Sequence, residues 1–439
     1  MGRTAIIGLG ITGYSTVRYL HGRERLVVVD TRKAPPLLDR LQQEYPDVET
    51  RLAATSFDPK DFDRAIISPG VALDSCLLEA ARGEIPFDSD IDLFCAAARA
   101  PVIAITGTNG KSTVTDLTGH LLNTCGLKVP TGGNLGAAAL DLLDDEADGY
   151  VLELSSFQLE RLRCHHFAAA TILNVSEDHL DRHGDMATYL ASKQWIYKDC
   201  AVAIANRQDA ATMPAYPVEE LITFGPDQAV DGHLGIVERD GERLLAQGTN
   251  AFCAAKALKI AGRHNEQNAL AACALALTRG VALEQLSPGL TTYQGLPHRA
   301  ERVLLAGGVE YINDSKATNV GATLAALSGF GDADDPRLLL IAGGDGKGAD
   351  FEPLRESVAA YVKELIVFGK DADRLIGAMR DVVPVARVPD MAAAVKHAHQ
   401  QARSGDTVLL SPACASLDMY ANFSARGDDF ARQVQEVTQ

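Results

Sequence analysis

Short apolar runs recur along the chain, and most of them end in a glycine-rich or polar turn followed by a helix-like stretch. Runs of this length bounded by turn residues are typical of buried strands, and their alternation with helices predicts mostly parallel α/β sheets. The predicted strands cover residues 4–8, 26–29, 65–67, 102–106, 150–154, 171–175, 201–205, 309–313, 338–342, 365–368 and 407–410. At 439 residues the chain can hold three domains. We expect them to span residues 1–89, 90–294 and 295–439.

Part of the second predicted domain departs from this alternation. In residues 221–260, Asp240 and Gly241 separate two short runs. A two-residue Asp-Gly loop is a hairpin signal, so we expect a small antiparallel flap here. Further along, we expect residues 264–268 to cap an alanine-rich helix, and residues 287–294 to link the second domain to the third.

The strongest chemical signal is the sequence Gly-Thr-Asn-Gly-Lys-Ser-Thr at residues 107–113, between a predicted strand and a predicted helix. The two glycines let backbone N–H groups turn inward, and Lys111 adds a positive charge. Ser112 or Thr113 places a hydroxyl at the helix N-terminus, as a magnesium ligand would require. The strict phosphate-loop pattern has a glycine at the position of Ile105, so this is a variant phosphate loop.

A second glycine motif, G-x-G-x-x-G at residues 8–13, follows the first predicted strand and opens a helix. Asp30 ends the next strand, so the motif is a dinucleotide-binding fingerprint in its usual context and predicts a Rossmann-like domain. By itself the motif leaves open whether the ligand is NAD or another diphosphate. Thr31 and Arg32 follow the second strand, and Ser68, Pro69 and Gly70 follow the third, at the sheet edge where such ligands bind.

Strand ends near the phosphate loop carry residues suited to a cation. Glu153 lies near the end of one predicted strand, and His179 follows the next. Each has an ordinary alternative, an ion pair for Glu153 and a capping or packing role for His179, but together they favour a magnesium site. Lys193 lies on a helix predicted at residues 187–198, where a lone lysine usually faces solvent. Residues 132–136 are predicted to form a glycine turn.

Three loops of the third domain carry a cationic side chain at the end of a predicted strand or turn: Arg299, Lys316 and Lys347. Such a set in an acidic protein indicates an anionic substrate or a nucleotide. The formal net charge of −17 argues against nonspecific binding to nucleic acid or anionic membranes. No apolar run approaches the ~20 residues of a membrane span, and no secretory leader is recognisable. The eight cysteines show no metal-binding spacing, so we expect a cytoplasmic protein with mostly reduced thiols.

Together these motifs resemble those of the Mur ligases, the ATP-dependent amide-bond ligases of bacterial peptidoglycan precursor synthesis, and the resemblance covers nearly the full length. The phosphate loop is shared with the broader family, which includes folylpolyglutamate synthase. The third-domain motifs are similar to those of the branch that adds D-glutamate: they occupy residues 295–299, 313–319, 343–347 and 411–418. The resemblance implies an α/β fold of three domains: a Rossmann-like N-terminal domain, a central P-loop ATPase-like domain with a small antiparallel flap, and a C-terminal Rossmann-like domain.

The resemblance also implies a role for individual residues. The ATP-binding residues would be Gly107, Thr108, Asn109, Gly110, Lys111, Ser112, Thr113, Asn265, Asn268, Arg299 and Asp314. The catalytic residues would be Lys111, Glu153, His179 and Lys193, with magnesium held at two sites by Ser112, Thr113, Glu153, His179 and a carbamylated Lys193. UDP-N-acetylmuramoyl-L-alanine would contact Thr31, Arg32, Ser68, Pro69, Gly70 and Asn134, whereas D-glutamate would contact Lys316, Thr318, Lys347, Ser416, Leu417 and Phe423.

The implied reaction has two steps. The carboxylate of the acceptor attacks the γ-phosphate of ATP to give an acyl phosphate and ADP, and the amine of D-glutamate then displaces phosphate. ATP would touch the second and third domains and the acceptor the first and second, so we expect the domains to close on their ligands. We expect a monomer with no nucleic-acid partner and no membrane insertion.

Three other functions compete with this interpretation. A nicotinamide-dependent oxidoreductase would use residues 8–13 but leaves the phosphate loop and the third-domain loops unexplained. A non-catalytic nucleotide-binding regulator would keep Lys111 but has no need of Glu153, His179 and Lys193 together. A folylpolyglutamate synthase-like ligase would share the chemistry, but the uridine-type first domain argues against it.

Overall fold

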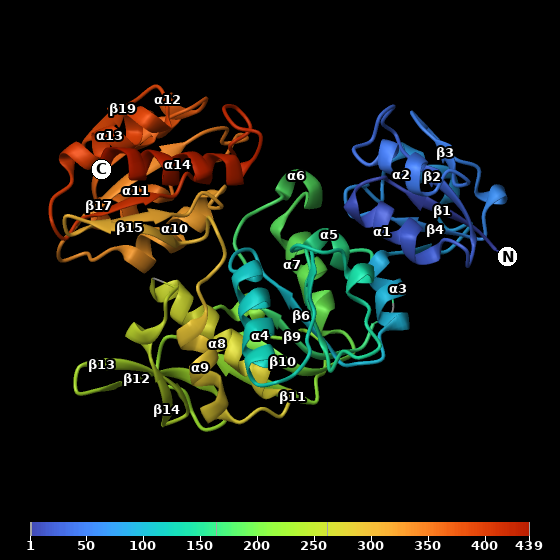
Figure 1. Cartoon of the computed structure of the whole chain (residues 1–439), viewed down its shortest axis with the longest axis horizontal. Helices are drawn as coiled ribbons and strands as arrows, with labels where there is room; N and C mark the ends of the chain where they lie inside the picture. Colours follow the sequence, from blue (N-terminus) through green and yellow to red (C-terminus); the bar gives the residue numbers. More distant parts are fainter. Residues whose placement is uncertain (1, 164, 261, 439) are drawn as a thin grey trace.

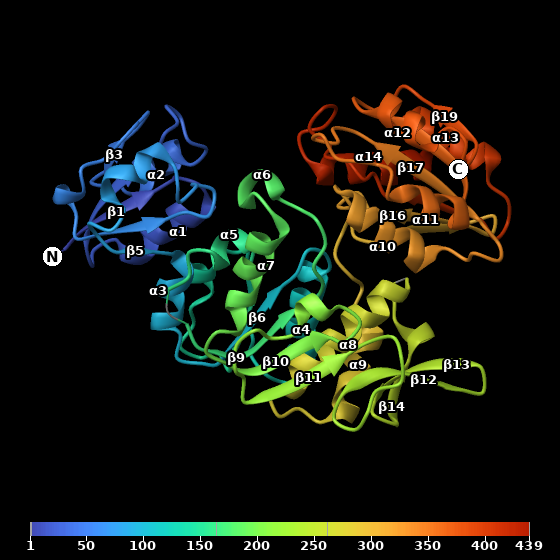
Figure 2. The ribbon, with the colours of Figure 1, turned by 180° about the vertical axis from the view of Figure 1, so that it is seen from behind.

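The computed structural model describes residues 2–163, 165–260 and 262–438. Its ribbon forms three bodies that follow one another along the chain, and the first and third lie on the same side of the central one (Figure 1). The view from behind shows the same arrangement, with the ribbons of the two outer bodies apart (Figure 2). Each body is built around its own sheet. The predicted α/β fold with three domains is therefore confirmed.

The first domain contains a five-stranded parallel sheet in the order β3-β2-β1-β4-β5. Its elements are β1 (Arg3–Ile7), α1 (Ile11–Leu20), β2 (Arg25–Val29), α2 (Leu38–Glu44), β3 (Glu49–Arg51), β4 (Arg64–Ile67) and β5 (Phe87–Asp88). Val27, Val28 and Val29 are all buried, because a parallel sheet is covered on both faces. The strand order reverses between β1 and β4, so the loops after these strands form the edge where such sheets bind ligands.

The central domain contains a nine-stranded sheet in the order β14-β13-β12-β11-β10-β9-β6-β8-β7. Its strands are β6 (Val102–Thr106), β7 (Thr131–Gly133), β8 (Tyr150–Glu153), β9 (Phe167–Ile172), β10 (Cys200–Asn206), β11 (Glu220–Phe224), β12 (Leu234–Arg239), β13 (Glu242–Gln247) and β14 (Asn250–Ala254). β6 lies between β8 and β9 and is parallel to both. The loop after β6 therefore has the ends of β8 and β9 on either side.

The helices of the central domain are α3 (Asp90–Ala97), α4 (Lys111–Thr124), α5 (Ser156–Leu159), α6 (Leu180–His183), α7 (Met186–Gln194), α8 (Arg263–Leu277) and α9 (Leu286–Thr292). α4 and α8 pack against each other in one apolar core, together with strands of the sheet. The residues from Ala269 to Ala276 are all buried in α8. Six of these eight residues are alanine or cysteine, whose small side chains fit a helix that is enclosed by α4 and the sheet.

The predicted small antiparallel flap is present as β12, β13 and β14, with the hairpin turn at Asp240. Its first strand, β12, also pairs with β11, so the flap continues the main sheet.

Three other local predictions for the central domain are wrong. Gly132 and Gly133 belong to the edge strand β7 instead of a turn. Residues 264–268 lie inside the first turns of α8, whose N-cap residue Gly262 has no side-chain cap. Residues 287–294 are largely helix α9 and pack onto α4. These errors share a cause, because local patterns do not report pairing with distant segments.

The third domain contains a six-stranded sheet in the order β15-β16-β20-β17-β18-β19, parallel except for the hairpin of β15 and β16. Its elements are β15 (Glu301–Ala306), β16 (Val309–Asn313), α10 (Val320–Phe330), β17 (Leu338–Gly343), α11 (Leu354–Tyr361), β18 (Val362–Phe368), α12 (Ala372–Met379), β19 (Val385–Arg387), α13 (Met391–Gln401), β20 (Thr407–Leu410) and α14 (Phe423–Thr438). The predicted hairpin around Gly307 and Gly308 is present. Across the described parts of the chain, no helix combines the length and apolar character that crossing a bilayer would require.

Candidate active site

The phosphate loop joins the end of β6 to the start of α4. Gly110 occupies the N-cap position in a left-handed conformation with φ 82°, which only glycine adopts without strain, and no side chain caps the first turn of α4. The helix therefore presents backbone N–H groups with the dipole orientation that favours an anion. Lys111 folds back over the loop, where its Nζ donates to the carbonyl oxygens of Gly107 at 2.9 Å and Thr108 at 2.8 Å.

Contacts from the segment after β9 fix the shape of this loop. Thr108 N donates to the Asn174 carbonyl oxygen at 2.9 Å, and Asn109 N donates to Asn174 Oδ1 at 2.8 Å. Thr108 Oγ1 also lies 3.1 Å from the hydroxyl of Tyr189 on α7. The loop is thus ordered by the protein itself.

Glu153 is the only acidic residue of β8 and lies next to the phosphate loop. Its side chain is 2% exposed and accepts hydrogen bonds from Ser112 Oγ at 2.5 Å and Asn134 Nδ2 at 2.7 Å. Arg299 of the third domain donates to the same Ser112 Oγ at 2.7 Å. Residues predicted from three separate motifs therefore meet around one serine hydroxyl.

Lys193 projects from α7 to the underside of the phosphate loop. It is only 1% exposed, so it is not a surface lysine. Its Nζ donates to the Gly107 carbonyl oxygen at 2.9 Å and lies 4.5 Å from the ring centroid of Tyr189. Burial, reinforced by the charge of Lys111, lowers the pKa of Lys193 well below its usual value. Burial also lowers the pKa of Lys111. A neutral amine at Lys193 is the form that reacts with carbon dioxide to give a carbamate.

His179 precedes α6 and is more open than the other candidate metal ligands. Its side chain is 48% exposed, and Nε2 lies 3.7 Å from Asp178 Oδ2. Among residues 2–163, 165–260 and 262–438, no three His, Cys, Asp or Glu side chains lie together as a metal-binding set. Mg²⁺ commonly keeps several waters and takes one or two carboxylates plus substrate phosphates. Glu153, which is hydrogen-bonded to the Ser112 hydroxyl, fits a site of that kind.

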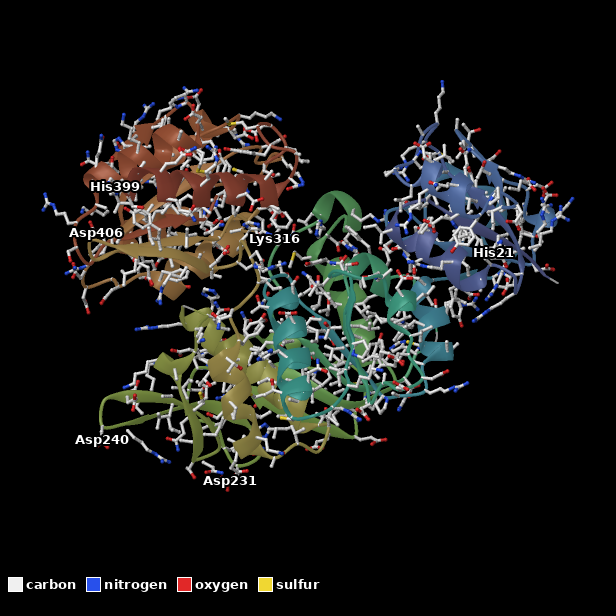
Figure 3. All side chains as sticks on the ribbon, in the orientation of Figure 1. His21, Asp231, Asp240, Lys316, His399 and Asp406 are labelled. Atoms are coloured by element: carbon white, nitrogen blue, oxygen red, sulfur yellow. The ribbon has the colours of Figure 1, made fainter. Side chains whose placement is uncertain are left out.

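A cavity of about 650 Å³ lies between the central domain and the third domain. Eight of the predicted ATP-binding or substrate-binding residues line it: Asn109, Gly110, Thr113, Asn265, Asn268, Arg299, Asp314 and Lys316. Lys316 lies where the third domain faces the central one (Figure 3). The cavity opens directly onto the phosphate loop, so its position and lining suit a nucleoside triphosphate.

The charged groups of this cavity titrate unusually because they are buried. Burial raises the pKa of Asp314 to about 7, although its Oδ2 accepts a hydrogen bond from Ser411 Oγ at 3.0 Å. Burial, followed by the charge of Arg299, lowers the pKa of Lys316 to about 8. Shifted pKa values in a cleft are characteristic of functional sites.

The predicted D-glutamate residues gather on the loops of the third domain, on both sides of β20. Lys316 Nζ lies 3.8 Å from the ring centroid of Phe423, the first residue of α14. Ser416 is buried and Leu417 is exposed. Thr318 N donates to the Lys316 carbonyl oxygen at 2.8 Å. Lys347 is exposed in a left-handed conformation with φ 49°, in a loop whose Asp345 pairs with Ala415.

The first-domain candidates lie at the sheet edge after β1, β2 and β4. Asp30 accepts from the backbone N–H groups of Leu9 and Arg32 and pairs with the Arg32 guanidinium through two hydrogen bonds of 2.9 and 2.7 Å. Arg32 thereby holds the pKa of Asp30 below its usual value, against the effect of burial. An acidic residue so fully engaged has little capacity left for the ribose hydroxyls of NAD. Thr31 beside this ion pair is exposed.

The glycine fingerprint also has a packing role. A Cβ atom on Gly13 would lie 1.9 Å from the Gly8 carbonyl oxygen, which excludes any side chain there. Ser68 Oγ donates to the same carbonyl oxygen at 2.9 Å, so the loop of Ser68, Pro69 and Gly70 is tied to the fingerprint. A Cβ on Gly10 would meet nothing within 4 Å, which leaves open space beside the backbone for a ligand.

Comparisons with known proteins match all three domains. The model of the Mur ligase MurD-like N-terminal domain matches residues 2–85, that of the Mur ligase middle domain residues 105–276, and that of the Mur ligase glutamate ligase domain residues 298–414. The chain belongs to the Mur ligase family. Two relatives, both called UDP-N-acetylmuramoylalanine–D-glutamate ligase, illustrate the similarity. That of Chromohalobacter salexigens is 46% identical over 437 residues, covering 97% of this chain and 96% of the relative. That of Pseudomonas aeruginosa is 44% identical over 438 residues, covering 98% and 97%.

Solved structures show the same fold at lower sequence identity. UDP-N-acetylmuramate–alanine ligase MurC from Thermotoga maritima is 17% identical, with a TM-score of 0.62 and full coverage of both chains. MurF from Acinetobacter baumannii is 19% identical, with a TM-score of 0.63 over 98% of this chain and 93% of that one. These likenesses establish the three-domain Mur ligase fold.

Two buried arginines of this Mur ligase were not predicted from the sequence to have a role. Arg161 follows α5, and Arg426 lies on α14, where its guanidinium donates to the backbone oxygens of Ser315, Gly343 and Cys414 at 2.8 to 3.3 Å. Arg426 thus ties together three loops that carry predicted D-glutamate residues. An arginine in an amphipathic helix, such as Arg426, or in a turn, such as Arg161, is usually a surface residue, so the sequence carried no signal for either role.

Proposed function

We propose that this protein is the Mur ligase that joins D-glutamate to UDP-N-acetylmuramoyl-L-alanine, with conversion of ATP to ADP and phosphate. The observation that carries the proposal is that the phosphate loop, the cavity and the cationic loops of the third domain meet around Ser112 and Arg299. An amide ligase needs the triphosphate, the carboxylate and the amine in one place. The names of relatives at 44–46% identity over nearly the whole chain support this substrate pair.

ATP occupies the cavity between the central and third domains. Gly107, Thr108, Asn109 and Gly110 cradle its phosphates through backbone N–H groups, and Lys111 turns from the loop carbonyls to the β- and γ-phosphates. The remaining nucleotide contacts come from Asn265, Asn268, Arg299 and Asp314. Arg299 reaches in from the third domain and is suited to the transferred phosphoryl group, because its guanidinium presents several donors in one plane.

Magnesium is the cofactor that this donor set fits. Ser112 or Thr113 with Glu153 would hold one ion, and His179 with a carbamylated Lys193 would hold a second. The bound ions would neutralise phosphate charge during transfer. Carbamylation changes Lys193 from a cation into an anion, and the amine that its lowered pKa makes available is the reacting form.

The acceptor spans the first and central domains. Thr31, Arg32, Ser68, Pro69 and Gly70 hold the uridine diphosphate at the sheet edge. Asn134, fixed by its hydrogen bond to Glu153, holds the muramoyl-alanine end next to the phosphate loop. D-Glutamate binds through Lys316, Thr318, Lys347, Ser416, Leu417 and Phe423, which offer the cationic and hydroxyl partners that a dicarboxylate needs.

The reaction follows from this placement. A carboxylate oxygen of the acceptor forms a bond to the γ-phosphorus, and the bond to the ADP oxygen breaks, giving an acyl phosphate. The neutral amine of D-glutamate then attacks the acyl carbon, loses its proton, and expels phosphate as the amide forms. Lys111 and Arg299 stabilise the negative charge on the transferred group.

We also propose that the domains extend over residues 1–89, 90–294 and 295–439, and that the protein acts as a cytoplasmic monomer. The three separate sheets support this division. An NAD-dependent oxidoreductase is disfavoured by the engagement of Asp30 with Arg32.

Phosphate release from ATP tests the proposed function. UDP-N-acetylmuramoyl-L-alanine and D-glutamate are added singly and then together, with magnesium present and L-glutamate as the control. We expect release only when both substrates are present, and none with L-glutamate. Release without either substrate, or none with both, would remove the assignment.

A further inference from the structure

A buried arginine joins the first domain to the central domain directly behind the proposed acceptor site. The side chain of Arg161 is 3% exposed. Its Nη1 donates to the Ser68 and Val71 carbonyl oxygens at 2.9 and 3.2 Å, and its Nη2 to the Pro69 and Val71 carbonyl oxygens at 3.3 and 3.1 Å. One central-domain residue thus holds three carbonyl groups of a first-domain loop.

Two further charged residues complete this arrangement. Glu160 Oε1 accepts from Arg161 at 2.8 Å and from Arg182, on α6, at 2.6 Å. Arg182 also donates to the Val71 carbonyl oxygen at 3.3 Å. We refer to Glu160, Arg161 and Arg182 as the Arg161 cluster. A buried cation such as Arg161 is tolerated when it is paired and hydrogen-bonded, and the partly buried Arg182 shares its partner Glu160.

The cluster orients the loop toward the ligand side. In a trans peptide the C=O and the following N–H point in opposite directions. Because the Pro69 carbonyl points at Arg161, the Gly70 N–H points away from it. The planar guanidinium can satisfy several carbonyls in one fixed geometry, which a lysine ammonium on a flexible stem does not reproduce.

The cluster also reaches the two segments that carry candidate metal ligands. Arg161 Nε donates to the Phe157 carbonyl oxygen at 2.6 Å, within the stretch that begins at Glu153. Arg182 follows His179 by three residues in α6. The acceptor loop and both of these segments are therefore held by the same three side chains.

We propose that the Arg161 cluster is a positioning device that sets the acceptor loop of the first domain against the phosphoryl-transfer site of the central domain. Arg161 acts through the loop of residues 68–71 and does not itself touch substrate. The inference rests on the proposed function, because it assigns that loop to the uridine diphosphate of the acceptor.

The test compares Michaelis constants for the three substrates in the full-length enzyme. Arg161→Gln, Arg161→Lys and Arg182→Gln are measured with UDP-N-acetylmuramoyl-L-alanine, ATP and D-glutamate varied in turn. We expect Arg161→Gln to raise KM for the acceptor about tenfold or more, with KM for ATP and D-glutamate changed less than about twofold. Arg161→Lys should recover only part of the loss, and Arg182→Gln should raise the same KM by about threefold.

Arg163 provides a matched control at the same junction. It lies two residues further on, is 55% exposed, and contacts Asp88 at 3.2 Å and the Phe87 carbonyl oxygen at 3.5 Å. Arg163→Gln should leave all three Michaelis constants within about twofold of the wild type. Thermal unfolding shows whether each variant folds. If Arg161→Gln does not fold, the acceptor KM of Arg182→Gln tests the role of the cluster, since the Arg182 side chain is only partly buried.

The outcomes separate the inference from the proposed function. A wild-type enzyme that does not use the acceptor would overturn the proposed function. If the wild type does use it, an unchanged acceptor KM in Arg161→Gln and Arg182→Gln would overturn the role of the cluster. So would a uniform rise in all three constants accompanied by a lower melting temperature, because that pattern indicates general destabilisation.

Discussion

The two junctions of the central domain are built differently. At the junction with the first domain, Asp141 accepts hydrogen bonds from Ser15 at 2.8 Å and Arg18 at 2.6 Å, and Arg161 donates four to one loop. At the junction with the third domain, the cavity lies between the domains, and the polar contacts described across it include Arg299 with Ser112 at 2.7 Å and Asn319 with Asp178 at 3.2 Å.

The two junctions are therefore expected to differ in mobility. A junction held by several hydrogen bonds, most of them at least partly buried, keeps its geometry, whereas domains joined across a cavity by a few polar contacts are expected to move. Both views show the third domain joined to the central one at the side where α10 faces α8 (Figures 1 and 2). We expect the first domain to hold the acceptor in register and the third domain to close over ATP.

The largest effect should come from the phosphate loop, which lies at the junction of the central domain with the third domain (the second junction). Lys111→Ala removes the positive charge beside the transferred phosphoryl group, and we expect kcat to fall by at least about a thousandfold. Phosphate release at saturating substrates measures the change. Lys198→Ala is the control, because Lys198 is an exposed lysine that lies over the Trp195 ring. Near-normal turnover by Lys111→Ala would contradict the placement of ATP at this loop.

Removing the bridge between the central and third domains should have the next largest effect. Arg299→Ala deletes the donor to Ser112, and we expect kcat/KM for ATP to fall by about 10- to 100-fold. Arg299→Lys should recover little, because an ammonium does not reproduce the planar donor set. An unchanged kcat/KM for ATP would mean that the second junction does not take part in nucleotide binding.

Titration of Lys316 should make the binding of D-glutamate at the junction with the third domain depend on pH. Its pKa of about 8, lowered by burial and by Arg299, means that it is charged below pH 8 and loses the charge above it. KM for D-glutamate should therefore rise about tenfold between pH 7 and pH 9 beyond the part caused by the substrate amine. Lys316→Arg should remove the tenfold rise that is due to Lys316, because arginine stays charged. Identical profiles for the two enzymes would exclude Lys316 from D-glutamate binding.

The smallest effect should come from a single polar contact at the first junction. Asp141→Asn removes the charge of a pair with Arg18, in which both side chains are partly exposed. Because exposed pairs contribute little, we expect less than about a twofold change in each Michaelis constant and a slightly lower melting temperature. A large rise in acceptor KM would show that the first junction depends on Asp141 as much as on Arg161.

The sequence predicted the features that local patterns determine. The hairpin around Gly307, the strand before Lys111 and the helix after it are each specified by neighbouring residues, and the structure has them. The proposed role of Lys193 as a carbamylated magnesium ligand came only from the family resemblance, since a lone lysine on a helix gives no such signal. The structure shows why it matters, because its Nζ contacts the phosphate loop.

What the sequence could not predict depends on distant segments. The antiparallel strands after β11 extend the main sheet because β12 pairs with β11. The pattern of apolar and polar residues in 221–260 does not indicate this pairing. Arg161 and Arg426 contact backbone carbonyls up to 93 and 111 residues away in the chain. A hydrogen bond to a backbone oxygen imposes no residue type on its partner, so such contacts cannot be read from a single sequence.

Isotope transfer tests directly whether the acceptor carboxylate attacks the γ-phosphate of ATP. The enzyme is supplied with UDP-N-acetylmuramoyl-L-alanine labelled with ¹⁸O in the alanine carboxylate, together with ATP, magnesium and D-glutamate. An acyl phosphate formed from that carboxylate predicts that the released phosphate carries an ¹⁸O atom, as mass spectrometry would detect. Unlabelled phosphate accompanied by amide product would contradict the proposed mechanism.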